Sequence, residues 1–350
     1  MSLGVVHEEP LPPIPFRQWT LAGKLQVGAV LAVLTVGPAA AYGVILSMPG
    51  RSHQGALPAL TPAEVDLRDR EGADLSHLTG DIGERNTLHP EALAAAAGWI
   101  EAELRAAGYS PERQTYAVDG LDCANVEAEH RGSGTPEEIV VVGAHYDSAR
   151  GTPGANDDGT GVVALLSLAR TAAARPTRRT VRFVAFVNEE PPYFATPRMG
   201  SAVHAARSSA RGEKIVAMLS LEMLGSYDDR EHSQHYPFPL GAFFPDHGDF
   251  IALVGNVDSR ALVRSAVGAF RRTTPFPSEG AALPDGTTAA DWSDHRSFWA
   301  QGYPALMVTD TAIFRYAHYH RRSDTPDKVD LDRLARVTGG LHHVIAALAE

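Results

Sequence analysis

The sequence predicts a three-layer α/β/α sandwich with a mostly parallel, mixed central sheet, preceded by one transmembrane helix. Three observations support this prediction. Continuous apolar runs alternate with helical segments along most of the chain, as in sheets that are buried on both faces. The chain has 350 residues, which is enough for one large α/β domain. One apolar segment near the N-terminus is long enough to cross a bilayer.

The apolar N-terminal segment is the first element. From Val27 to Met48 the chain has 22 residues without a charge, enough to span a bilayer core of about 30 Å. Two basic residues precede the segment and one follows it, a weak positive-inside bias. We therefore expect a signal anchor at 27–48, with residues 1–26 as a cytoplasmic tail.

A cleaved signal peptide is the alternative for this segment. Ala39 and Ala41 form a small-residue pattern at which a signal peptidase cuts, and cleavage there would give a secreted protein. The 26 residues before the apolar run are long for a signal peptide, and the run continues past the alanines. We therefore favour a single-pass protein of the cell membrane, with its main domain outside the cytoplasm.

The next elements are a linker and a helix. Residues 49–84 are predicted to be a linker and lead-in, because proline, glycine and small residues dominate their first part. A helix is expected at 90–107, where Pro90 suits the first helical position and Gly108 suits the cap at the end. The catalytic domain is predicted to occupy residues 85–350.

Five apolar runs predict the strands of the sheet. They are residues 138–145, 181–187, 214–223, 250–256 and 304–310. A helix with an apolar stripe is expected at 161–174, between the first two strands, and another at 329–349. Ligands of such sheets bind beyond the carboxyl ends of the strands, so polar residues there are candidates for a site.

Acidic and imidazole side chains follow three of these strands. His145 and Asp147 end the first strand in GAHYDS, on the same side of an extended segment. Glu189 and Glu190 directly follow the second strand, and Glu222 lies at the end of the third. Adjacent buried carboxylates are costly unless a cation pairs with them. The sequence therefore predicts a cation site at this edge of the sheet.

Two more segments supply candidates. Asp157 lies in GANDDGTG before the helix at 161–174, where it either caps the helix or, through the flanking glycines, turns toward the same edge. Near the C-terminus, AHYHRRSDTPDKVD contributes His320. Asp294, in SDHRSFW, is a further candidate for the wall of the site.

The donor types indicate the metal. Cys123 is the only cysteine, so the site must use His, Asp and Glu. Imidazole and oxygen ligands suit a catalytic zinc site, with Mn or Co as possible substitutes. The candidate ligands suffice for two ions that share Asp157, which leaves Glu189 as a base. They are His145, Asp157, Glu190, Glu222 and His320.

The charge of the chain argues against nucleic acid as a partner. The formal net charge is −11, and no general cationic surface is available for phosphates.

Taken together, several motifs resemble the co-catalytic zinc aminopeptidases of peptidase clan MH. That group includes bacterial leucyl aminopeptidase, glutamate carboxypeptidase and the glutaminyl cyclases. The motifs are GAHYDS, PGANDDGTGVVALLSLAR, NEE, SLEMLG, SDHRSFW and YH-x-x-x-DT-P-D-K. The resemblance covers residues 85–350, and their ordered occurrence is more specific than any single motif.

The resemblance implies a ligand arrangement. His145 and Glu222 would bind one zinc ion. Glu190 and His320 would bind the other, and Asp157 would bridge the two ions. The position of Glu222 is more commonly Asp in the well-known aminopeptidases.

The resemblance also implies a reaction. Glu189 is similar to the family's general base, and Asp147 to the carboxylate that orients the metal-binding histidine. The implied substrate is a peptide with a free N-terminus, from which the first residue is hydrolysed.

Three other functions stay open at this point. One is a glutaminyl cyclase-like acyltransferase with a single zinc ion. Another is a carboxypeptidase-like hydrolase of small acidic peptides, suggested by Arg321 and Arg322 beside His320. The third is an inactive ectodomain that serves as a receptor. The complete ligand set favours the two-metal peptidase.

Overall fold

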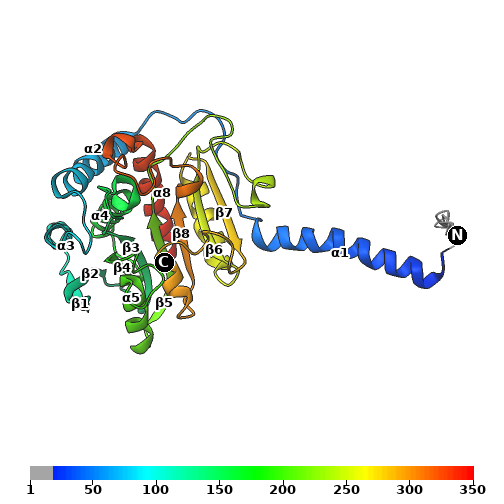
Figure 1. The fold of residues 1–350 in the computed structure, drawn as a ribbon, viewed down its shortest axis with the longest axis horizontal. Helices are drawn as coiled ribbons and strands as arrows, with labels where there is room; N and C mark the ends of the chain where they lie inside the picture. The colour runs from blue at the N-terminus through cyan, green and yellow to red at the C-terminus, as the bar shows by residue number, and fades with distance from the viewer. Residues whose placement is uncertain (1–18) are drawn as a thin grey trace, which may run out of the picture.

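The central sheet sets the positions of all other elements. The structure is a computed structural model that describes residues 19–350, apart from the side chains at 38, 39 and 41. In the described residues, eight strands form one sheet in the order β1-β2-β4-β3-β5-β8-β6-β7 (Figure 1). The pairs β3–β4, β3–β5, β5–β8 and β6–β7 are parallel, and the other three pairs are antiparallel. The predicted mixed, mostly parallel sheet is confirmed. The strands are β1 (Glu112–Val118), β2 (Leu121–His130), β3 (Thr135–His145), β4 (Arg179–Phe186), β5 (Lys214–Glu222), β6 (Ile251–Asn256), β7 (Ser278–Leu283) and β8 (Ala305–Thr309).

Helices cover both faces of the sheet, which confirms the three layers. The α-helices are α1 (Leu21–Ile45), α2 (Pro62–Ser76), α3 (Pro90–Ala106), α4 (Thr160–Ala172), α5 (Gly200–Ala210), α6 (Arg260–Thr273), α7 (His295–Trp299) and α8 (Leu331–Leu348). Val140 and Val142 of β3 face α3, α4 and α8, whereas Val141 faces α5 and α7. Successive residues of β3 thus pack into opposite layers, which explains why the strand is apolar without interruption.

Some elements of the structure have no counterpart among the expected ones. These are β1, β2 and β7 and the helices α2, α5, α6 and α7. β1 lies at the sheet edge with mostly exposed side chains, so its sequence lacks a continuous apolar run. α2 begins at Pro62 with a capping box between Thr61 and Glu64, a signal that lies inside the segment interpreted as a linker.

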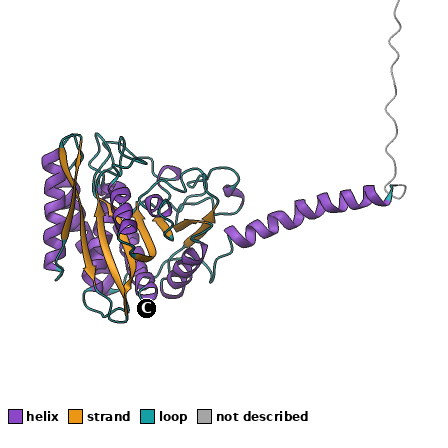
Figure 2. Cartoon of the chain, turned by 90° about the horizontal axis from the view of Figure 1, so that it is seen from below, coloured by secondary structure: helices purple, strands orange, loops and turns teal. Residues whose placement is uncertain are grey.

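Helix α1 extends away from the sandwich as an isolated helix (Figures 1 and 2). It has 25 residues, and none of its most apolar stretch is buried by the rest of the chain. A helix that is apolar all round needs an apolar environment, and this one is long enough to cross a membrane. Its length and place near the N-terminus also fit a signal sequence. Most of the predicted cytoplasmic tail lies outside the described residues, and the boundaries at 26, 48 and 84 stay predictions.

The end of α1 is fixed to the domain by two arginines of α6. Arg260 donates hydrogen bonds to the backbone carbonyls of Gly43 and Val44, and Arg264 donates to the carbonyl of Ser47. The last carbonyls of a helix lack partners within it, so Arg260 completes the hydrogen bonding of α1, while Arg264 holds the chain just beyond its end.

Candidate metal centre

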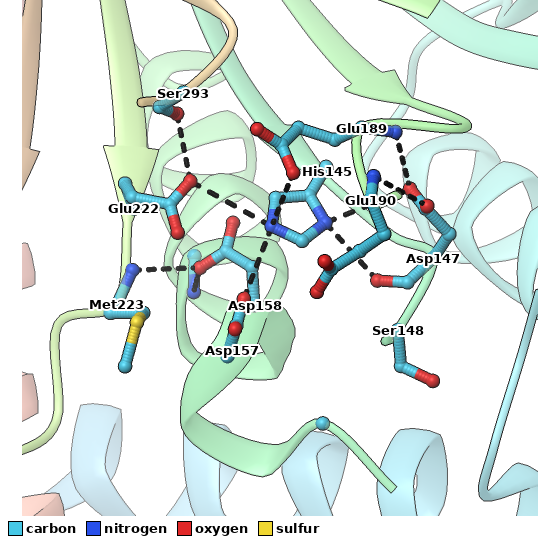
Figure 3. A network of polar contacts seen from close by, with 12 residues as sticks. His145, Asp147, Ser148, Asp157, Asp158, Glu189, Glu190, Glu222, Met223 and Ser293 are labelled. Carbon is cyan, nitrogen blue, oxygen red and sulfur yellow. Dashed lines mark hydrogen bonds and ion pairs between the residues drawn. The ribbon is translucent and has the colours of Figure 1, made fainter. Parts of the chain in front are cut away.

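The predicted site residues meet at one edge of the sheet (Figure 3). β4, β3 and β5 are parallel neighbours, and His145 of β3 pairs in register with Phe186 of β4. His145 and Glu222 therefore close their strands at the same edge, and the two glutamates after β4 follow there. Asp157 reaches this edge from the kinked turn Ala155–Gly159, directly before α4.

Asp157 lies between the two predicted histidine ligands. Its Oδ1 is 3.3 Å from Nε2 of His145, and its Oδ2 is 3.2 Å from Nε2 of His320. Glu190 approaches the same imidazole, with Oε2 3.1 Å from Nε2 of His320. The ligand atoms of His145, Asp157 and Glu190 lie within 4.8 Å of one another, as those of a metal-binding group do.

A second group of potential ligands lies on the other side of His145. Oε2 of Glu222 is 3.7 Å from Nε2 of His145, and Asp158 completes this group within the same 4.8 Å limit. Asp158 was not among the predicted site residues. Its Oδ1 accepts hydrogen bonds from the backbone N–H groups of Met223 and Gly161, so the carboxylate also joins the start of α4 to the end of β5.

Several polar atoms of the centre are buried without a hydrogen-bond partner among residues 19–350. They are Nε2 of His145, Oδ2 of Asp157, Oδ2 of Asp158 and Oε1 of Glu190. Buried carboxylates of this density are unfavourable without a positive charge. The donor set of imidazole nitrogen and carboxylate oxygen fits zinc, so a bound cation accounts for these orphaned atoms.

The pKa values of the centre without metal reflect the same crowding. Burial raises the pKa of Glu190 to about 7, and the charge of Asp157 adds to the shift. Burial also raises the pKa of Glu189, with contributions from Glu222 and Glu190. Burial alone would lower the pKa of His145, but Glu222 and the other nearby carboxylates outweigh it and raise that pKa. The shifts of Glu190 and His145 oppose the protonation states that can bind a cation, and a bound cation would reverse them.

Asp147 holds the acidic pair in place. Its Oδ1 and Oδ2 accept hydrogen bonds of 3.1 Å from the backbone N–H groups of Glu189 and Glu190. Oδ1 also lies 3.6 Å from Nδ1 of His145, the ring nitrogen that faces away from the centre. A carboxylate in this position orients a metal-binding imidazole.

Two further side chains support the ligands. Ser293 donates a hydrogen bond of 2.7 Å to Oε2 of Glu222. Asp324 accepts hydrogen bonds from the backbone N–H groups of Asn156 and Asp157, and so holds the kinked turn. Both residues lie in motifs quoted above, Asp324 in YH-x-x-x-DT-P-D-K and Ser293 in SDHRSFW, but neither was among the predicted site residues.

The loop before this turn is tied by a buried arginine. Arg85 is fully buried and donates hydrogen bonds to the backbone carbonyls of Tyr146, Gly83, Pro153 and Gly154. Because Tyr146 lies beside His145 and Gly154 lies before Asp157, this guanidinium joins the two segments that carry those residues.

An apolar pocket adjoins the centre. Glu222 and Tyr319 form part of its wall, and the ring of Tyr319 stacks on His320 at 3.9 Å between centroids. The rest of the wall comes from the segments 234–244, 250–254, 279–283, 288–292 and 307–314. Most of these side chains are apolar.

Other candidates lie away from the pocket. Arg321 and Arg322 are exposed and are not part of its wall. Tyr193, from the segment that follows the acidic pair, is buried and donates a hydrogen bond to Asp119. Asp294 is buried, and its pKa is raised to about 7 by burial.

The fold and the centre define a class first: a zinc-dependent hydrolase built on an α/β/α sandwich, with residues at the strand ends that could hold a metal ion. Residues 125–345 match the model of peptidase family M28, and the chain belongs to this family.

The relatives agree with this assignment. The chain is 35% identical over 295 residues to the uncharacterized protein YfbL of Escherichia coli (strain K12), covering 82% of this chain and 89% of that protein. It is 27% identical over 291 residues to a probable zinc metalloprotease of Leptosphaeria maculans, covering 69% of this chain and 64% of that protein.

Solved structures share the fold. A zinc aminopeptidase from Bacillus subtilis superposes with a TM-score of 0.64 at 14% identity, covering 81% of this chain and 95% of that one. Fimbriiglobus ruber glutaminyl cyclase superposes with a TM-score of 0.61 at 21% identity, covering 84% of this chain and 99% of that one. The fold alone therefore does not separate the two reactions.

Proposed function

We propose that this chain is a membrane-anchored aminopeptidase that uses two zinc ions to remove the N-terminal residue of peptides. The main support is that two ligand groups share His145, while Glu189 lies 3.9 Å from its Nε2 and belongs to neither group. Ligands for two ions beside a spare carboxylate are the components of metal-assisted hydrolysis.

The proposed ligands divide around Asp157. His145 and Glu222 would hold one ion, and Glu190 and His320 would hold the other. Asp157 would be shared between them, which agrees with one of its oxygens facing each histidine. Asp158 has a positioning role through its Oδ1, which is engaged by two backbone N–H groups, and its unpartnered Oδ2 completes the group with His145 and Glu222. Mn or Co are possible substitutes for zinc.

Glu189 is the proposed general base. Zinc bound at this centre supplies a water of lowered pKa and a polarised scissile carbonyl. Glu189 accepts the proton of that water and returns it to the leaving amine. Asp147 fixes the backbone N–H of Glu189, so the base is held by a residue that also orients His145.

The pocket indicates the side chain at the substrate N-terminus. Its apolar wall, including Phe244, Phe250 and Leu283, adjoins the proposed ligand Glu222 and suits a large apolar residue. An acidic preference, which Arg321 and Arg322 suggested, finds no support in the wall of this pocket.

Membrane anchoring rests on α1. The helix is apolar, long enough to span a bilayer and not covered by the domain. We propose that it is a signal anchor with the catalytic domain outside the cytoplasm; release after signal cleavage is the alternative.

The test is metal stoichiometry on the purified full chain in detergent, together with hydrolysis of leucyl, phenylalanyl and glutamyl anilides. We expect two zinc ions per chain and faster hydrolysis of the apolar substrates. One zinc ion per chain, with cyclisation of an N-terminal glutamine instead of hydrolysis, would replace this proposal by the glutaminyl cyclase reaction. Preference for the glutamyl substrate would favour an acidic-peptide hydrolase.

A further inference from the structure

An uncharged aromatic loop lies between β5 and β6. Residues 236–245 read YPFPLGAFFP, and we call them the aromatic loop. Phe238 is 99% exposed and Phe243 is 54% exposed. Two phenylalanines exposed in a loop without a single charge are unusual for a surface in contact with water, and such patches mark interaction sites.

The aromatic loop lies where α1 leaves the domain. Leu240 and Phe244 of the loop pack on a small apolar cluster that includes Leu283 of β7. Ile45 and Leu46, at the end of α1, pack on the same cluster. In Figure 1 the yellow-green loop with the short helix Leu240–Ala242 lies next to the domain end of α1, on the side from which α1 projects.

Two arginines, Arg260 and Arg264, lie at the same end of α1 as the aromatic loop. Arg260 holds the carbonyls of Gly43 and Val44 in the last turn of α1, and Arg264 holds that of Ser47 just beyond it, so their guanidinium groups lie where a transmembrane α1 would reach the membrane surface. Basic side chains at that depth are attracted to anionic lipid headgroups. The aromatic loop, the end of α1 and the two arginines together have the composition of a membrane-facing surface.

The mouth of the apolar pocket belongs to this surface. Leu240 and Phe244 line the pocket, and so do Trp292 and Ile313, which are 44% and 40% exposed. The pocket that reaches the proposed ligand Glu222 is thus rimmed on one side by the aromatic loop.

We propose that the aromatic loop inserts into the interfacial layer of the bilayer beside α1, so that the pocket opens toward the membrane surface. The partner is the lipid bilayer itself. The substrates favoured by this arrangement are peptides whose apolar N-termini lie at that surface. The inference rests on the membrane anchoring of α1 under the proposed function, and it adds a second contact with the membrane and a source of substrate.

Immersion of the loop is measured with nitroxide labels on the full chain in vesicles of phosphatidylcholine and phosphatidylglycerol. Cys123 is buried and is the only cysteine, so Cys123→Ala provides a background for Phe238→Cys. A label at Val36→Cys, within α1, shows whether that helix lies in the bilayer. Leu88→Cys is the matched control, because Leu88 is 58% exposed and immediately precedes α3, at the other end of the sandwich (Figure 1).

We expect the label at 238 to collide with oxygen more than with a water-soluble nickel complex, like the label at 36 and unlike the label at 88. If the label at 36 lies in lipid while the label at 238 behaves like that at 88, the anchor stands and the inference is wrong. If the label at 36 is also in water, the anchoring fails and the inference fails with it. Dipolar broadening between labels at 238 would show a second copy of the chain on the loop, which also overturns the inference.

Kinetics provide an independent readout. Phe238→Ser/Phe243→Ser changes residues that do not line the pocket, so hydrolysis of a soluble leucyl anilide should stay unchanged. Hydrolysis of a peptide with an N-terminal leucine, attached to the same vesicles through a C-terminal lipid, should fall by about tenfold as the effective local concentration drops. Equal rates for the variant and the parent on the lipid-attached peptide would contradict a role for the loop in substrate access.

Discussion

Asp147 accepts a hydrogen bond from the backbone N–H of Glu189, with 3.1 Å between Oδ1 and the nitrogen. Its second oxygen does the same for Glu190, and the carboxylate also faces Nδ1 of His145. One buried side chain thus connects the proposed base with two proposed ligands. The loss of its charge should therefore lower the metal affinity more than it lowers the stability of the fold.

Asp147→Asn keeps the shape of the side chain but leaves one oxygen to accept two backbone N–H groups. We expect a loss of metal affinity of about 10- to 100-fold, because the orientation of His145 and of the acidic pair is loosened. Competition with a chelator measures it, with Glu231→Gln on the exposed surface as the control. Unchanged affinity in the Asn variant would remove Asp147 from this role.

Glu189→Gln should keep both metal ions and lose turnover. Proton transfer by a positioned carboxylate contributes about 10²- to 10⁴-fold to the rate, and the amide does not accept the proton. Metal content and anilide hydrolysis are measured on the same sample. Glu190→Gln is the comparison, because a change at this proposed ligand should lower the metal content. Full turnover in Glu189→Gln would show that the base lies elsewhere.

Arg85→Met should destabilise the fold and weaken metal binding together. It removes donors from four backbone carbonyls, and the two fully buried ones, of Tyr146 and Gly154, belong to the segments beside His145 and Asp157. Unsatisfied buried groups of this kind cost about 1–3 kcal/mol each, so we expect a large fall in thermal stability. Arg105→Met is the control, because Arg105 is 57% exposed and its pair with Glu101 contributes at most about 0.5 kcal/mol. Similar melting temperatures for the two variants would contradict this account.

Glu71 of α2 predicts a pH dependence of stability. It is fully buried against α8 and α4, and burial raises its pKa to about 8. The folded state therefore binds the proton more tightly than the unfolded state does. The stabilisation is complete below about pH 4.5 and is lost as pH rises to about 8. Glu71→Gln should remove this slope and raise the melting temperature at pH 8 but not at pH 4.5. If the pH dependence of stability persists in the variant, titratable groups other than Glu71 cause it.

Metal removal should add a second pH dependence. Without metal, burial and Asp157 raise the pKa of Glu190 to about 7, so the metal-free fold should lose stability between about pH 4.5 and pH 7. Metal-loaded protein should not, because the cation favours the charged carboxylates. Melting curves with and without chelator, in the Glu71→Gln background, isolate this effect. Identical curves would mean that the carboxylates hold no cation.

The predicted site residues gather because of simple rules of the sheet. Parallel strands that are apolar throughout bring their carboxyl ends to one edge, so His145 and Glu222 could be placed together without coordinates. The helix start after NDDG placed its two aspartates near the same edge, but the sequence left open whether Asp157 caps the helix or faces the site. Their assignment as ligands stays a prediction, although the geometry brings them within reach of shared ions.

Other parts of the site had no local signal in the sequence. Asp157 and Asp158 are adjacent, and nothing in NDDG says which carboxylate faces the histidines and which caps α4. The apolar pocket combines segments from residue 234 to residue 319, each too short for a periodic pattern. The edge strand β1 pairs on one side only, so its burial pattern is weak.

The hold of Arg260 and Arg264 on α1 has a kinetic consequence. A domain on a flexible linker would sample a hemisphere of solution, whereas a domain bonded to the last turn of its membrane helix keeps one height and one tilt. With α1 in the bilayer, encounters with a peptide that lies at the membrane surface become two-dimensional. Turnover should then follow the number of substrate molecules per unit area of membrane instead of their concentration in the surrounding volume.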